Sequence, residues 1–217
     1  MNKYLLVSFL IFLVFLSAFS IRKPAILIIG DSISIGYTPF VKKHFEGKAI
    51  ITHNPGNAQH TGTGLDKIEE WLGDEDWDII QFNWGLWDLA YRHPDAKAYG
   101  NRDKINGTVT YSVAEYAANL DSLITSIKSK TDAKLIFVTT SYVPGEEAGR
   151  ITSDVKNYNK AAKLVMKKHG VEVNDIYKKS VKIHQKYGVG NDDVHYTADG
   201  YEKLSKLISS YLEKELK

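Results

Sequence analysis

Apolar runs and amphipathic stretches alternate along the chain from about residue 25. Short runs rich in Ile, Val, Leu and Phe are typical of buried strands. Between them, apolar residues recur every three or four positions, as in helices that bury one face. The alternation predicts an α/β protein whose mostly parallel five-stranded sheet is covered by helices on both faces. We expect the strands at residues 25–29, 49–53, 78–82, 135–139 and 171–174.

Helix signals fill most of the space between these strands. Thr38 and Pro39 suit a helix start, because proline is favoured in a first turn. Ser112 and Glu115 form a capping box for the helix that follows. We expect helices at about 38–46, 64–72, 112–127, 153–168, 176–187 and 197–216. The remaining long stretches, 84–111 and 188–196, are predicted to be loops. No repeat or linker interrupts this order, so residues 21–217 are predicted to form a single domain.

The first twenty residues differ from the rest of the chain. Lys3 precedes an apolar run over residues 4–19, and Ala18 and Ser20 are small residues at the positions that signal peptidases read. This pattern predicts a signal peptide over residues 1–20, cleaved after Ser20, and a secreted or periplasmic protein. The alternative is an uncleaved membrane anchor. The chain has no Cys, which excludes a lipoprotein anchor and disulfides.

Charge and histidine spacing exclude several classes of partner. The net charge is +2 and the lysines are spread along the chain, which favours neither a nucleic acid nor a membrane surface as partner. Membrane contact is expected only through the signal segment. His53, His60 and His93 could lie near one edge of the sheet, but they lack a metal-ligand spacing such as His-Glu-x-x-His. We therefore expect neither a metal nor a cofactor.

Two short stretches carry candidate chemistry. Ser32 follows the first strand immediately after Gly30-Asp31, where open α/β sheets bind ligands. Near the other end, Asp192 precedes His195 by three residues at the entrance to the last helix. A carboxylate so placed can orient an imidazole, which in turn activates a serine nucleophile. The pattern predicts a catalytic set of Ser32, His195 and Asp192. The alternative for Ser32 is a residue that caps a helix.

Gly30-Asp31-Ser32-Ile33 and Asp192-x-x-His195 resemble the first and last motif blocks of the SGNH (GDSL-type) hydrolase family. The resemblance implies a flavodoxin-like three-layer sandwich and ester hydrolysis through an acyl-enzyme. The family's acid lies three residues before the histidine, which favours Asp192 over Asp193. Asp31 is expected to bond loop amides.

The resemblance also implies an oxyanion site, with two departures. The family combines the N–H of the nucleophile, a glycine N–H after strand two and an Asn side chain after strand three. Here Gln59 occupies the glycine position and Trp87 the Asn position. We expect the backbone N–H groups of Ser32 and Gln59, together with the side chain of Asn83, to form this site. The indole N–H of Trp87 is the alternative third donor.

The substrate is expected to be a small-molecule or carbohydrate ester. Exported relatives often deacetylate polysaccharides, so a carbohydrate O-acetylesterase is preferred, with a lipase, lysophospholipase or thioesterase as alternatives. Aromatic residues after the third strand suit stacking on a sugar ring, contact with an apolar acyl group, or core packing. The displaced Asn motivates a further alternative, an inactive carbohydrate-binding module. These aromatic residues are Trp84, Trp87, Tyr91 and Tyr99.

Overall fold

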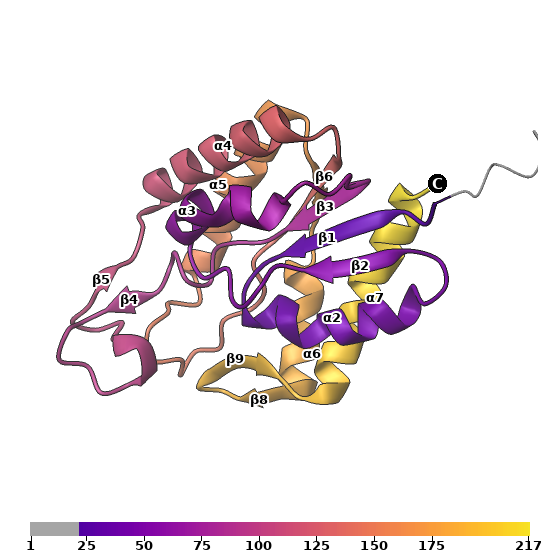
Figure 1. Ribbon diagram of the computed structural model, residues 1–217. Helices are drawn as coiled ribbons and strands as arrows, with labels where there is room; N and C mark the ends of the chain where they lie inside the picture. The colour runs from indigo at the N-terminus through magenta and orange to yellow at the C-terminus, as the bar shows by residue number, and fades with distance from the viewer. Residues whose placement is uncertain (1–21) are drawn as a thin grey trace, which may run out of the picture.

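A sheet of five parallel strands forms the centre of the protein (Figure 1). The structure is a computed structural model that describes residues 22–217, so the predicted signal peptide lies outside the described residues. The strands are β1 (Ala25–Ile29), β2 (Ile50–His53), β3 (Ile79–Phe82), β6 (Lys134–Val138) and β7 (Glu172–Asn174). Their order, β2-β1-β3-β6-β7, is the flavodoxin-like order. The predicted fold class is confirmed, and each strand lies within one residue of its predicted bounds.

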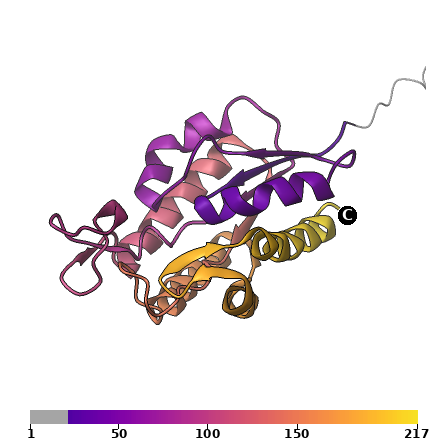
Figure 2. The same cartoon turned by 90° about the horizontal axis from the view of Figure 1, so that it is seen from below.

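Helices cover both faces of the sheet, giving three layers (Figures 1 and 2). One layer contains α3 (Thr61–Leu72), α4 (Val113–Lys130) and α5 (Asp154–His169). The other contains α2 (Ser32–His44), α6 (Tyr177–Tyr187) and α7 (Ala198–Glu215). Since both faces are covered, β1 is apolar along its whole length and all five of its residues are buried.

The strand register brings the site-forming loops together. In the sheet, Ile28 pairs with His53 of β2, and Ile29 pairs with Phe82 of β3. The carboxyl ends of β1, β2 and β3 therefore meet at one edge. In an open α/β sheet, this edge is where ligands bind.

Helix α2 begins at Ser32, six residues before the predicted start, and the prediction from Thr38 and Pro39 was wrong. The Asp31 side chain caps this helix by accepting a hydrogen bond from the Ile33 N–H at 2.9 Å. Pro39 lies inside the helix. The Thr38 hydroxyl donates to the Ser34 carbonyl at 2.7 Å in the turn that contains the proline. The early start places Ser32 at the positive end of the helix dipole.

The predicted loop 84–111 contains two short antiparallel strands, β4 (Tyr91–Arg92) and β5 (Thr108–Val109). A 3-10 turn, η1 (Tyr99–Asn101), lies between them. We call residues 91–109 the excursion, which projects from the sheet at the lower left of Figure 1. The Tyr91 N–H donates to the Gly149 carbonyl at 2.7 Å, and the Lys104 N–H donates to the Ala148 carbonyl at 2.8 Å. The excursion is therefore tied to the segment that precedes α5.

The predicted loop 188–196 is a two-stranded hairpin instead, with β8 (Gly188–Gly190) paired to β9 (Asp193–Tyr196). The hairpin lies beside α2 and α6, at the bottom of Figure 1. A strand of this hairpin, and not a loop, therefore carries Asp193 and His195. Within residues 22–217, no helix is long and apolar enough to cross a membrane.

Candidate active site

The turn that presents Ser32 is held by the loop after β2. The Gly30 N–H donates to Asn54 Oδ1 at 3.0 Å, and the Gly30 carbonyl accepts from the Ala58 N–H at 3.0 Å. These bonds fix both backbone groups of Gly30 between the strand and the helix. Ser32 follows as the first residue of α2, and its side chain lines a surface cavity.

Ser32, His195 and Asp193 are joined in one hydrogen-bonded chain. Ser32 Oγ lies 2.8 Å from His195 Nε2, and His195 Nδ1 lies 2.5 Å from Asp193 Oδ1. With the proton on Nδ1, the imidazole donates to Asp193 and Nε2 accepts from the Ser32 hydroxyl. The side chains of Asp193 and His195 are both 40% exposed. This is the geometry in which an oriented imidazole activates a serine.

Asp193, instead of the predicted Asp192, lies against the imidazole. Side chains two apart on a strand point to the same face, so Asp193 and His195 of β9 lie side by side. Asp192 is exposed in the hairpin turn, with Oδ1 close to Gly190. The prediction of Asp192 assumed a loop leading into a helix, and the hairpin replaces that geometry.

Burial alone would raise the pKa of Asp193, but several contacts together lower it. The backbone N–H and the imidazole of His195 donate to its carboxylate, and Arg102 lies nearby. The carboxylate is therefore held in its ionised form, which accepts the Nδ1 proton. On the backbone side, the imidazole of His184 lies with Nε2 2.7 Å from the Asp193 carbonyl oxygen.

His184, on α6, is buried. Its ring packs edge-on against Tyr142 and Tyr196, with centroids 5.3 and 5.2 Å away. Because Nε2 contacts the backbone of Asp193, His184 positions the strand that carries the acid and the base.

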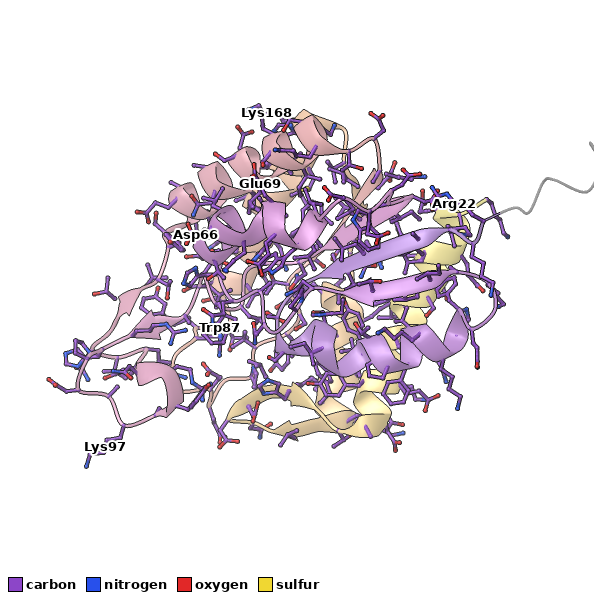
Figure 3. The ribbon with its side chains drawn as sticks, in the orientation of Figure 1. Arg22, Asp66, Glu69, Trp87, Lys97 and Lys168 are labelled. Atoms are coloured by element: carbon purple, nitrogen blue, oxygen red, sulfur yellow. The ribbon has the colours of Figure 1, made fainter. Side chains whose placement is uncertain are left out.

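The cavity beside Ser32 has a volume of about 280 Å³. Of the aromatic residues singled out in the sequence, Trp87 and Tyr99 line it, whereas Trp84 is buried in the core. Figure 3 shows Trp87 between the excursion and the sheet. The lining residues are Ser32, Leu86, Trp87, Arg92, Tyr99, Gly100, Arg102, Arg150, Asp193, Val194 and His195.

The predicted oxyanion donors are only partly brought together. Asn83 does not line this cavity, and its Nδ2 donates to the Val138 carbonyl at 2.7 Å. The Gln59 N–H donates to Asn57 Oδ1 at 2.8 Å. These two assignments are corrected, because both donors are engaged elsewhere in the fold. Within residues 22–217, the backbone N–H of Ser32 has no intramolecular acceptor. Of the two side chains considered, only that of Trp87 lines the cavity.

Asp31 plays the structural role expected from the sequence. Its Oδ1 accepts from the Ile33 N–H, and the side chain is fully buried. Burial raises its pKa, and this outweighs the Ile33 N–H and the Arg150 charge, which lower it.

The three histidines considered as metal ligands do not gather around one point. His60 caps α3, its Nδ1 accepting from the Thr63 N–H at 3.1 Å. His53 lies with Nε2 2.7 Å from Ser34 Oγ. Burial lowers the pKa of both His53 and His60, which favours their neutral forms. In the part of the chain that the structure describes, no three His, Asp or Glu side chains are grouped to hold a metal ion.

Three arginines on the cavity wall were not identified from the sequence. Arg92 and Arg102 belong to the excursion, and Arg150 precedes α5. They are separated by up to 58 positions, since Arg92 and Arg150 are the outermost pair. No spacing rule links such positions, so only the fold could show that they share a cavity.

A parallel sheet with Ser32, His195 and Asp193 hydrogen-bonded at its edge is an arrangement found in acyl-group hydrolases. The sequence model of the GDSL-like Lipase/Acylhydrolase family matches residues 28–203, and the chain belongs to this family. The family resemblance predicted from the sequence is confirmed, and membership supports an ester-hydrolysing activity. No curated protein sequence matches the chain.

Solved structures share the fold. A lipase/acylhydrolase from Enterococcus faecalis is 23% identical with a TM-score of 0.70, covering 88% of this chain and 96% of its own. An acetyl xylan esterase, AlAXEase, is 13% identical with a TM-score of 0.68, covering 86% and 98%. An acetylxylan esterase from Geobacillus stearothermophilus is 18% identical with a TM-score of 0.67, covering 85% and 92%. At these identities, the likeness concerns the fold.

Proposed function

We propose that this protein is a serine esterase that works through an acyl-enzyme. The hydrogen-bonded chain Ser32–His195–Asp193 carries the proposal. As Ser32 Oγ attacks the ester carbonyl carbon, its proton passes to His195 Nε2. His195 then gives that proton to the departing alcohol oxygen, while the carbonyl re-forms as an acyl-serine. Water, deprotonated by the same nitrogen, attacks the acyl carbon; the bond to Ser32 Oγ breaks, Nε2 returns the proton to that oxygen, and the acid leaves.

For the substrate we propose a carbohydrate O-acetyl ester. A cavity of about 280 Å³ lies just below the usual range for ligand sites, which suits an acetyl group and one sugar ring. Trp87 and Tyr99 supply aromatic surface on which a sugar can stack. The three arginines on the wall disfavour a long apolar acyl chain, which argues against a lipase. Two of the structural relatives are named as acetylxylan esterases, in agreement with this substrate class.

Export remains part of the proposal. The charged start, the apolar run and the small residues at positions 18 and 20 support a signal peptide that is cleaved after Ser20. Intact-mass measurement of the exported protein tests this point. A mature chain starting at Ile21 is expected, and a retained residue 1–20 segment would establish an anchor instead.

Hydrolysis by the wild-type protein and by Ser32→Ala tests the activity. We expect release of acetate from p-nitrophenyl acetate and acetylated xylo-oligosaccharides, decreasing with longer p-nitrophenyl acyl chains. Ser32→Ala is expected to lose nearly all of this activity, and a serine-directed phosphonate is expected to label Ser32. A folded wild-type protein without esterase activity would favour the binding-module alternative.

A further inference from the structure

The cavity beside Ser32 carries more positive than negative charge. Arg92, Arg102 and Arg150 all line it, whereas among residues 22–217 the only carboxylate on its wall is that of Asp193. Asp193 is already paired with His195. The cavity therefore presents three guanidinium groups next to the reacting serine.

A single buried carboxylate behind the wall serves two of these arginines. Glu147 is fully buried, and its Oε1 accepts from Nη1 of both Arg102 and Arg150, the latter at 2.9 Å. Its Oε2 accepts from the Gly149 N–H at 2.8 Å. Both oxygens of Glu147 are thus engaged. The single negative charge of Glu147 is shared by the two positive charges of Arg102 and Arg150. These three side chains together therefore keep a net positive charge.

Arg92 has no carboxylate partner within residues 22–217. Its Nε donates to the Thr110 hydroxyl at 3.3 Å, and its Nη1 donates to the Gly100 carbonyl. The guanidinium stacks over the Trp87 ring at 5.0 Å, which holds it in place through a cation–π contact. Its charge is therefore positioned without being neutralised.

Each of the three arginines keeps one nitrogen free for a ligand. No residue in the range 22–217 accepts a hydrogen bond from Nη2 of Arg92, Arg102 or Arg150. None of these atoms is among the fully buried polar atoms that lack a partner, so all three retain contact with solvent. The planar fork of arginine suits the paired oxygens of a carboxylate, sulfate or phosphate.

The positions of Arg102 and Arg150 are fixed before any ligand binds. Arg150 is 5% exposed, and its Nε donates to the Leu86 carbonyl at 2.5 Å. Arg102 Nε donates to the Tyr99 carbonyl at 2.9 Å. Burial is the main cause that lowers the pKa of Arg92 and Arg150, and repulsion from Arg102 adds to it, whereas Glu147 acts in the opposite direction. Gathering like charges in a partly buried wall is unfavourable for folding, and a bound oxyanion would offset this cost.

We propose that this arginine cluster, Arg92, Arg102 and Arg150, binds an oxyanion group on the substrate close to the ester that Ser32 attacks. The preferred substrate is then an O-acetylated acidic carbohydrate, in which a sugar carboxylate lies near the acetyl group. A sugar sulfate presents the same oxygen chemistry and is distinguished by the experiment. The inference rests on the proposed esterase function and names the substrate class of that site.

Paired substrates test the proposal. Acetylated oligogalacturonides with free carboxylates are compared with the same compounds after methyl esterification, which removes the charge and keeps the sugar. We expect the wild-type kcat/KM to favour the anionic substrate by about tenfold or more. The ratio of kcat/KM for the anionic substrate to kcat/KM for the methyl-esterified substrate is expected to fall close to one in Arg102→Gln. In Arg102→Lys this ratio is expected to recover in part. A sulfated acetyl-oligosaccharide that is preferred over the carboxylate identifies sulfate as the oxyanion.

Lys97→Gln provides the matched control. Lys97 lies in the same excursion and points away from the cavity wall, so its loss removes the same charge at another place (Figure 3). Lys97→Gln is expected to keep the wild-type ratio. An equal fall in both variants would indicate a general electrostatic field and overturn the proposal. If Arg102→Gln fails to fold, Arg92→Gln replaces it, since Arg92 has no bond to Glu147.

A binding measurement separates this proposal from the proposed activity. Calorimetry with Ser32→Ala detects binding of de-acetylated oligogalacturonide without any turnover. Binding that is lost in Ser32→Ala/Arg102→Gln supports the arginine cluster, even if the wild-type protein hydrolyses no ester. Conversely, a wild-type enzyme that hydrolyses both substrates equally and binds no acidic oligosaccharide keeps its esterase activity and overturns the proposal.

Discussion

Asp193 Oδ1 accepts two hydrogen bonds from His195, one from its backbone N–H at 2.9 Å and one from its imidazole at 2.5 Å. The acid thus holds both the strand and the ring of the base. Because the two residues alternate with the buried Val194 on β9, their relative placement follows from the pleat of one strand.

The first prediction concerns this acid. Asp193→Asn is expected to lower kcat by about 10²–10⁴, because an amide neither holds the required tautomer nor stabilises the imidazolium. Asp192→Asn removes the same charge one residue away, in the exposed turn, and is expected to stay within about twofold of wild type. Steady-state kinetics on p-nitrophenyl acetate measure both. If Asp192→Asn loses most of its kcat while Asp193→Asn keeps it, Asp192 is the catalytic acid, as predicted from the sequence.

The second prediction concerns the oxyanion site. Trp87→Phe keeps an aromatic ring under Arg92 and removes the indole N–H together with the five-membered ring that carries it. If that N–H donates to the oxyanion, kcat falls by about 10²–10³ with little change in KM, and this is the result we expect. Asn83→Ala leaves the Val138 carbonyl without its donor, so it is expected to lower the free energy of unfolding by about 1–3 kcal/mol and to leave kcat near wild type. The reverse pattern would identify Asn83 as the donor.

The third prediction concerns pH and stability. Burial raises the pKa of Asp88 to about 6, outweighing the bonds from Thr61 that lower it. Between the ordinary carboxyl pKa and about 6, the folded state binds more protons than the unfolded state, so stability falls as pH rises. Relative to wild type, Asp88→Asn is expected to gain about 2 kcal/mol in free energy of unfolding between pH 4 and pH 7.

Urea denaturation across this pH range measures the effect. Asp66→Asn, which removes an exposed carboxylate of α3, is the control and is expected to track the wild type (Figure 3). If the free energy of unfolding changes with pH in the same way in the wild type and in Asp88→Asn, Asp88 does not cause the pH dependence.

The fourth prediction concerns His184. His184→Phe keeps a ring between Tyr142 and Tyr196 but leaves the Asp193 carbonyl without its donor. We expect the free energy of unfolding to fall by about 1–3 kcal/mol, and kcat to fall less than in Asp193→Asn. Denaturant melts and kinetics together test this, and an unchanged kcat with full stability would show that the His184 contact does not position β9.

The sheet could be predicted from sequence because its central strands β1, β3 and β6 are largely buried on both faces and appear as mainly apolar runs. The β8–β9 hairpin was not predicted, because its glycines and its short strands are also typical of a loop. A signal was present, since polar Asp193 and His195 alternate with buried Val194 and Tyr196. Counting that alternation would have selected Asp193.

Other features of the site had no local signal. The engagement of the Asn83 amide by Val138 depends on the pairing of β3 with β6, across 55 positions of sequence. Thr38 and Pro39 predicted a helix start, but the helix begins six residues earlier, at Ser32, because Asp31 caps it there. In each case, a tertiary or capping contact outweighed a local preference.

The excursion has an evolutionary consequence. Arg92, Tyr99 and Arg102 belong to an appendage that leaves the sheet and returns to it, while the reacting groups lie on α2 and β9. Two arginines of the proposed cluster thus lie on the appendage and Arg150 lies outside it, so part of the recognition surface can change while α2 and β9 keep the reacting groups. Selection for new substrates would be expected to act first on residues 91–109.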